Sequence, residues 1–180
     1  ILPVETEIVK SFLAGLFFAF ANGNTGAAVN YPAMSPLVLS IASLDQSMTV
    51  SSYSSRGPET DLAMPGRNIN STYKGNTYAV LSGTSMATPF AAAAGAIALS
   101  KWGIGKLPNQ QALTDYLRRI ATDILPAGFD PETGYGAVFI RAILDTPPSG
   151  TPPPPPPPVD PPAPAPKVAA ATVVDAGYMM

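Results

Sequence analysis

Apolar side chains recur along residues 3–14 at the three- and four-residue spacing of one helix face, and Gly15 follows that pattern. Residues 16–21 are then apolar without interruption over the length of a strand. Because helices cover both faces of a parallel sheet, such a run predicts a central parallel strand. The sequence NGNTG at 22–26 predicts a loop at the carboxyl end of this strand, where open α/β sheets bind ligands.

The rest of the chain continues to alternate between short apolar strands and helices. In chain order, the pattern predicts a strand at 37–44, a turn-rich stretch at 49–66, a hairpin around 74–76, a buried helix at 85–100, an amphipathic helix that begins after Pro108, and a glycine-rich closing segment at 134–144. Strands that alternate with helices are typical of an α/β fold with a parallel sheet.

Composition separates a globular part from a tail. Apolar residues make up 46% of the 180 residues and charged residues only 12%, so residues 1–146 are expected to form one domain with a core. Most of the 22 prolines lie between Pro147 and Pro166. Since such a stretch cannot build a core, residues 147–180 are predicted to be a disordered, proline-rich linker or tail.

Charge and cysteine content exclude several classes of partner and site. The net charge is −2 and no basic cluster occurs, which argues against nucleic acid as a partner. The absence of cysteine excludes disulfides and thiolate-bound metals. The apolar stretch at 12–21 is too short to cross a bilayer, so no membrane span is expected.

One serine is placed as a nucleophile would be. Gly83 permits a tight turn, and Ser85 then begins a long helix, where free N–H groups and the helix dipole favour negative charge. Taken alone, Gly-Thr-Ser favours a simple helix cap over a nucleophile, since serine and threonine are common caps. Asn24, in the loop after the first strand, likewise fits an ordinary turn. The residues alone leave both alternatives open.

A wider set of motifs favours the nucleophile. The segment GTSMATP at 83–89 resembles the serine motif of the subtilisin-like serine proteases, the subtilases. Further matches follow the family's order over about residues 5–142: ANGNTG at 21–26, NYPAMSPLVLSIASLD at 30–45, YSSRGP at 53–58 where the family usually has FSSxGP, MPG at 64–66, and GYGAVFIRAIL at 134–144. The resemblance implies the C-terminal half of a three-layer, parallel-sheet subtilisin-like fold, and a Tyr31–Pro32 peptide that is often cis in the family.

The resemblance also implies roles for individual residues. Ser85 would attack a peptide carbonyl, and the Asn24 side chain with the Ser85 N–H would form the oxyanion hole. The expected substrate-binding residues are Ala21, Asn22, Gly23, Asn30 and Thr84, with Asn30 opposite the other pocket residues. Asn22 departs from the small residue usual in the family, and Phe90 replaces a non-catalytic histidine, which bears on helix packing.

The base that such a serine needs is missing. The sequence contains no histidine, and neither Asp-Thr-Gly nor Asp-Ser-Gly occurs. In subtilases the catalytic aspartate and histidine lie upstream, so the resemblance implies an N-terminal half as partner and a chain that is inactive alone. Lys101 cannot substitute, because sixteen helical residues place it about 24 Å from Ser85. Lys74 lies at a hairpin tip, with nothing to hold it beside the serine.

Two alternatives remain. An α/β-hydrolase would also carry a G-x-S-x-G-like elbow, but its acid and histidine follow the serine, and no histidine does here. A catalytically dead binding or structural module on a proline-rich stalk is favoured by the missing base, whereas the presence of both Ser85 and Asn24 opposes it. The leading hypothesis is a serine endopeptidase that acts on proteins or peptides and is secreted or extracytoplasmic, as the family resemblance implies.

No cofactor and no metal ligand are predicted in this chain, although a structural calcium would be compatible with the parent protein. Glu59 and Asp61 fall where some family members bind a cation weakly. Since exposed carboxylates are mostly solvated, a solvated acidic loop is the expected arrangement there.

Overall fold

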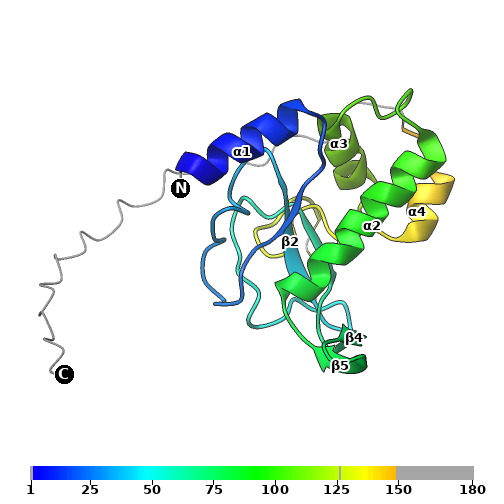
Figure 1. Ribbon diagram of the computed structural model, residues 1–180. Helices are drawn as coiled ribbons and strands as arrows, with labels where there is room; N and C mark the ends of the chain where they lie inside the picture. The colour runs from blue at the N-terminus through cyan, green and yellow to red at the C-terminus, as the bar shows by residue number, and fades with distance from the viewer. Residues whose placement is uncertain (1, 126, 149–180) are drawn as a thin grey trace, which may run out of the picture.

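The computed structural model describes residues 2–125 and 127–148 (Figure 1). In chain order the elements are α1 (Leu2–Leu13), β1 (Ala19–Ala21), β2 (Leu39–Leu44), β3 (Leu62–Pro65), β4 (Ile69–Tyr73), β5 (Thr77–Leu81), α2 (Thr84–Trp102), α3 (Gln110–Ile120) and α4 (Ile140–Asp145). None of the helices in these ranges is long and apolar enough to cross a membrane. The proposed tail at 147–180 lies outside the described residues except for its first two, so the division at 146 stays a prediction.

The three strands β1, β2 and β3 form a parallel sheet in that order, which confirms the α/β class. Every residue of β2 is buried, whereas β1 is only half-buried. The prediction that 16–21 forms a central strand was therefore wrong for the described residues: β2 is central and β1 is an edge. A run of apolar residues does not distinguish a central strand from an edge strand. Helices that cover both faces of a parallel sheet favour the same apolar run in either position.

Helix α2 lies across one face of the sheet, in front of the strands in Figure 1. Four alanines repeat along its buried side (Ala87, Ala91, Ala94 and Ala98), and they pack on the apolar side chains of β2 and β3. These small side chains let the helix approach the sheet closely. Gly95 on the same helix meets the ring of Phe17. Helices α3 and α4 complete this core.

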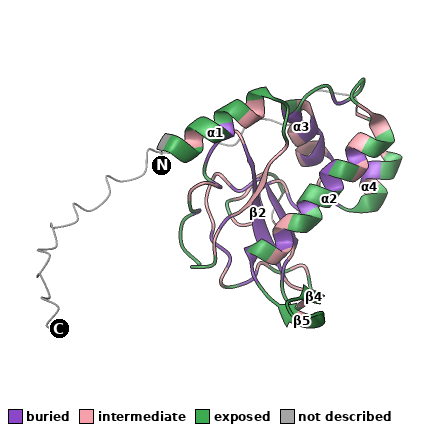
Figure 2. Ribbon diagram, viewed as in Figure 1, coloured by how far each residue is buried: buried purple, intermediate pink, exposed green. Residues whose placement is uncertain are grey.

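The opposite side of α2 is open, contrary to the prediction of a helix buried all round. Phe90, Ala92, Ala93 and Ala96 are exposed. Figure 2 shows that exposed parts, coloured green, recur along α2. The sequence contained no polar face to indicate this, because both sides of the helix are apolar. Phe90, expected to contribute to helix packing, is 42% exposed.

The other predicted elements have their counterparts, with one addition. The hairpin β4–β5 turns at 74–76, and α3 begins after Asn109, whose side chain caps it by accepting the Ala112 N–H. The Tyr31–Pro32 peptide is cis, as the resemblance implied. Strand β3 was not predicted, since it has four residues, ends in proline and lies in a stretch rich in turn residues.

Candidate active site

Ser85 is the second residue of α2 and its side chain is exposed. The turn before it is fixed by a hydrogen bond of 2.8 Å from the Gly83 N–H to the Gly66 carbonyl. A side chain on Gly66 would collide with Ser43 and crowd the Gly83 carbonyl. The close approach of two glycine backbones therefore brings the MPG and GTS segments together and presents Ser85 to solvent.

Asn24 lies in the loop after β1 and contacts the same turn. Its Oδ1 accepts the backbone N–H of Thr84 at 2.9 Å and the Thr84 hydroxyl at 3.0 Å. Because an N–H can only donate, the amide oxygen must face Thr84, and Nδ2 is left to donate elsewhere. Among the described residues, neither Asn24 Nδ2 nor the Ser85 N–H has a protein acceptor. Two unused donors thus lie at the start of α2, beside the exposed serine.

Thr84 connects the two predicted oxyanion residues. Its side chain is buried, and its hydroxyl donates to Asn24 while it accepts the Gly23 N–H at 3.3 Å. The role expected for Thr84 was substrate binding. The contacts show that Thr84 orients the Asn24 amide, and its contact with substrate stays a prediction.

The segment expected to line a specificity pocket lies directly beside Asn30. Gly23 has a φ of 110°, and a Cβ built on it would collide with the amide nitrogen of Asn30. The Asn30 N–H donates to the Asn22 carbonyl at 2.9 Å, which places these residues face to face. Asn30 is exposed and Ala21 half-buried. The exposed amide of Asn30 therefore limits the space above Gly23.

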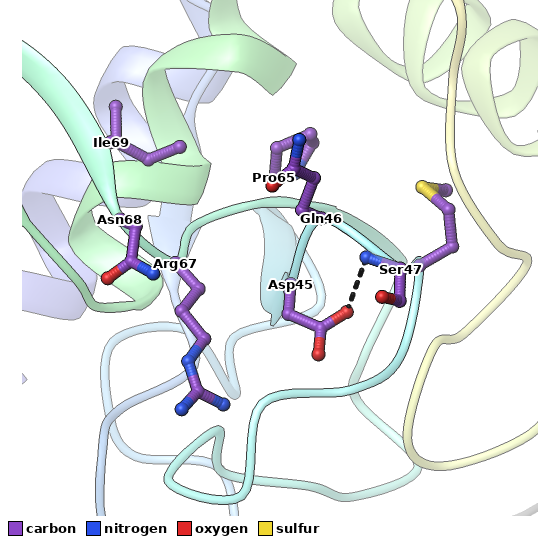
Figure 3. Close-up of a pocket in the computed structure, with 8 residues that line it drawn as sticks. Asp45, Gln46, Ser47, Pro65, Arg67, Asn68 and Ile69 are labelled. Carbon is purple, nitrogen blue, oxygen red and sulfur yellow. Dashed lines mark hydrogen bonds between the residues drawn. The ribbon is translucent and has the colours of Figure 1, made fainter.

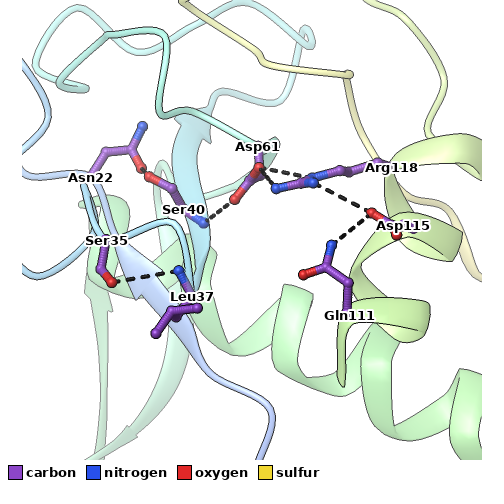
Figure 4. A network of polar contacts seen from close by, with 8 residues as sticks. All are labelled: Asn22, Ser35, Leu37, Ser40, Asp61, Gln111, Asp115 and Arg118. Atoms are coloured by element: carbon purple, nitrogen blue, oxygen red, sulfur yellow. Dashed lines mark hydrogen bonds and ion pairs between the residues drawn. The ribbon is translucent and has the colours of Figure 1, made fainter. Parts of the chain in front are cut away.

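The Asn22 side chain does not take part in that surface. It is fully buried, and its amide nitrogen donates to the Thr60 hydroxyl at 2.9 Å. Its amide oxygen accepts the Ser40 hydroxyl (Figure 4). Its unusual size is therefore accommodated inside the protein, and only its backbone reaches the pocket segment.

Tyr53 is a site neighbour that the sequence patterns missed. Its hydroxyl donates to the Gly66 carbonyl at 3.1 Å and lies 2.9 Å from the Ser43 hydroxyl. Since the Gly66 carbonyl also accepts the Gly83 N–H, Tyr53 supports the turn that presents Ser85. The available signal was the tyrosine in YSSRGP, where the family usually has phenylalanine.

Asp61 corrects the expectation of a solvated acidic loop. It is 5% exposed, and its carboxylate pairs with Arg118 on α3 at 2.6 Å. Burial raises the pKa of the Asp61 carboxyl, and the nearby Arg118 guanidinium opposes that rise. No group of three or more His, Cys, Asp or Glu residues suited to a metal ion occurs in the described ranges.

A hollow of about 550 Å³ with both polar and apolar lining residues lies at the carboxyl ends of β2 and β3 (Figure 3). Asp45 and Arg67 line it, and the Asp45 carboxylate accepts the N–H groups of Ser47 and Thr49. None of the predicted site residues lines this hollow.

Comparison with known proteins agrees with these motifs. The family model described as Subtilase family matches residues 6–136. The thermostable alkaline protease of Halalkalibacterium halodurans is 44% identical over 100 residues, covering 55% of this chain and 28% of that protein. The halolysin-like extracellular serine protease Nep of Natrialba magadii is 41% identical over 133 residues, covering 74% of this chain and 24% of that protein. Subtilisin Savinase of Lederbergia lenta is 42% identical over 122 residues.

The fold is shared with a solved structure as well. The crystal structure of a lanthipeptide protease superposes with a TM-score of 0.69 over 76% of this chain and 52% of that chain, at 23% identity. Curated relatives are longer: the aligned segments cover between 21% and 44% of their length. From its motifs, fold and match over residues 6–136, this chain belongs to the subtilase family of serine proteases.

Proposed function

We propose that this chain supplies the nucleophile and the oxyanion hole of a subtilisin-type serine endopeptidase. The observation that carries the proposal is the double hydrogen bond from Thr84 to Asn24 Oδ1, because it orients a free amide N–H beside Ser85. The Ser85 N–H provides the second donor, and the amino end of α2 adds a favourable dipole.

In this mechanism Ser85 Oγ attacks the carbonyl carbon of a peptide bond. The carbonyl oxygen becomes an oxyanion that accepts hydrogen bonds from Asn24 Nδ2 and the Ser85 N–H. A histidine takes the serine proton and returns it to the leaving amine, and water then hydrolyses the acyl-serine. This chain contains no histidine, so the base and its aspartate must come from an N-terminal polypeptide that packs against it.

The setting proposed for this reaction is secreted or extracytoplasmic, with proteins or peptides as substrates. The relatives from Natrialba magadii and Bacillus subtilis are named as extracellular proteases. The reaction needs no cofactor, since nucleophile, base and oxyanion donors are all protein groups.

The alternative is a catalytically inactive binding or structural module. The absence of histidine from all 180 residues favours it. The two hypotheses differ in what they require of Ser85, since a binding module would keep its function with Ser85→Ala.

Reconstitution tests the proposal. The chain is mixed with a polypeptide that carries a subtilase's aspartate and histidine segments, and fluorophosphonate labelling and peptide hydrolysis are measured. We expect both activities to appear only in the mixture and Ser85→Ala to abolish them. Ser100→Ala, which alters an exposed serine on the same helix, is the matched control and should leave them unchanged.

Asn24→Ala gives a quantitative check of the oxyanion hole. It should lower kcat by about 10²–10³, the loss measured when such a donor is removed from subtilisin, itself a subtilase. A reconstituted mixture that binds its partner but shows neither labelling nor hydrolysis would reject the peptidase in favour of the binding module.

A further inference from the structure

Both oxygens of the buried Asp61 carboxylate accept hydrogen bonds. Its Oδ1 accepts two hydrogen bonds from the Arg118 guanidinium, from Nε at 2.9 Å and from Nη2 at 2.6 Å. Its Oδ2 accepts the backbone N–H of Ser40 at 2.7 Å. Figure 4 shows this arrangement between the strands and α3. Both oxygens that a metal ion would use are therefore already bonded.

The Arg118 guanidinium also contacts a second carboxylate and the face of an aromatic ring. Its Nη1 lies 3.5 Å from the Asp115 carboxylate, and its Cζ lies 5.7 Å from the centre of the Tyr135 ring. The Arg118 side chain is 16% exposed and that of Asp61 only 7%. One cation is thus enclosed by two carboxylates and an aromatic face, in a position shielded from water.

Glu59 has no place in this cluster. Among the described residues, no hydrogen bond or ion pair joins Glu59 to Asp61 or Arg118. The Glu59 carboxylate instead lies so close to Gly57 that a Cβ built there would contact it at 2.5 Å. Glu59 and Asp61, which fall where some family members bind a cation weakly, therefore do not form a metal site together in this chain.

We infer that Arg118 is an internal cation that replaces the metal ion at Asp61, and that removing its guanidinium creates a binding site for a small cation between Asp61, Asp115 and the Tyr135 ring. A buried carboxylate without a partner is costly, and it takes up either a proton or a counter-ion; the inferred partner here is a counter-ion from solution, which enters the vacated space. The Arg118–Asp61 pair belongs to the fold, and its cation binding does not depend on the proposed peptidase activity.

The test is thermal unfolding of the full chain, together with any polypeptide that copurifies with it, in calcium, methylguanidinium or tetramethylammonium chloride at equal ionic strength. Wild-type Tm should not respond to calcium or methylguanidinium. Arg118→Ala should lower Tm by roughly 10 °C, and methylguanidinium or calcium should restore a large part of that loss. Tetramethylammonium, too large and unable to donate hydrogen bonds, should not.

Arg119→Ala is the matched control, because Arg119 is the next residue on α3 but contacts a carbonyl and the Tyr116 ring instead of a carboxylate. It should show no cation response. Three results would each overturn the inference. They are a loss of Tm in Arg118→Ala that no cation restores, an equal Tm response to cations in Arg119→Ala, and a calcium response of the wild-type Tm that Asp61→Asn removes.

If Arg118→Ala does not fold, refolding is followed by Trp102 fluorescence. Recovery only with methylguanidinium or calcium supports the cation site, and no recovery with any cation overturns it.

Discussion

Asn30 and Gly23 show how one side chain sets the shape of a surface beside the nucleophile. The Asn30 amide occupies the space that a side chain on Gly23 would need. Asn30 also bonds the segment that leads to Asn24, through its N–H and the Asn22 carbonyl. Since that N–H is a backbone group, substitution of Asn30 changes the space above Gly23 without removing this bond.

Replacing Asn30 by glycine should therefore widen the proposed specificity pocket. In the reconstituted peptidase we expect kcat/KM to rise about tenfold for substrates with a large aromatic residue at the cleavage site, relative to alanine there. Asn109→Gly, at the helix cap of α3, is the control for a general effect of an asparagine-to-glycine change and should leave the ratio unchanged. An unaltered ratio in Asn30→Gly would place the pocket elsewhere.

The placement of residues was predictable where a local motif fixed it. Ser85 and Asn24 belong to short segments whose neighbours fix the backbone, and the structure brings both to the same turn. The burial of Asp61 was not predictable in this way, because its partner Arg118 lies 57 positions away and no periodic pattern connects them. Likewise, the sequence shows that Asn22 is unusual but not that Ser40 and Thr60 receive its side chain.

Among the larger elements, the turn at 130–136 closes one side of the sheet. The Tyr135 N–H donates to the Asp61 carbonyl at 2.8 Å, and the Ala63 N–H donates to the Gly136 carbonyl at 3.0 Å. Gly134 has a φ of 64°, and a Cβ there would collide with the Asp61 backbone. The turn can approach β3 only because this position has no side chain.

Gly134→Ala should consequently lower the free energy of unfolding by roughly 3 kcal/mol or more, since it combines backbone strain with a clash that no side-chain rotation relieves. Gly105→Ala is the matched control: Gly105 lies in open space, so its change should stay within about 1 kcal/mol. Chemical denaturation followed by Trp102 fluorescence measures both. Equal stability of the two variants would mean that the turn moves away from β3 at little cost.

Elements with a long or periodic pattern were predictable, and their boundaries and neighbours less so. The hairpin and the start of α3 follow from turn and cap residues that act locally. The four-residue strand β3 depends on pairing with β2, so its conformation is fixed by tertiary contact and not by its own composition. The length of β1, three residues within a six-residue apolar run, is set in the same way.

At the scale of the whole molecule, the described residues leave apolar surface uncovered. An almost wholly apolar groove of about 450 Å³ lies between α2 and α4, and Phe90, Ala93, Phe139 and Ile140 are exposed along it. Extended apolar surface of this kind marks an interaction site in soluble proteins. The sequence predicted an apolar helix but not that this face would be open, because periodicity does not reveal which neighbour covers a surface.

If the proposed N-terminal partner packs on this groove, a charge placed there should block assembly without unfolding the chain. Alone, the chain should bind the apolar dye 1-anilinonaphthalene-8-sulfonate, and the dye's fluorescence should fall when the histidine-bearing polypeptide is added. Ala93→Arg should prevent that fall and abolish reconstituted hydrolysis, while its own Tm stays within a few degrees of wild type, because position 93 is exposed.

Gln111→Arg adds the same charge to the exposed side of α3 and should change neither the dye signal nor the hydrolysis. If Ala93→Arg assembles as the wild type does, the partner binds elsewhere, and the edge of β1 becomes the surface to alter next, because β1 pairs only with β2 among the described strands.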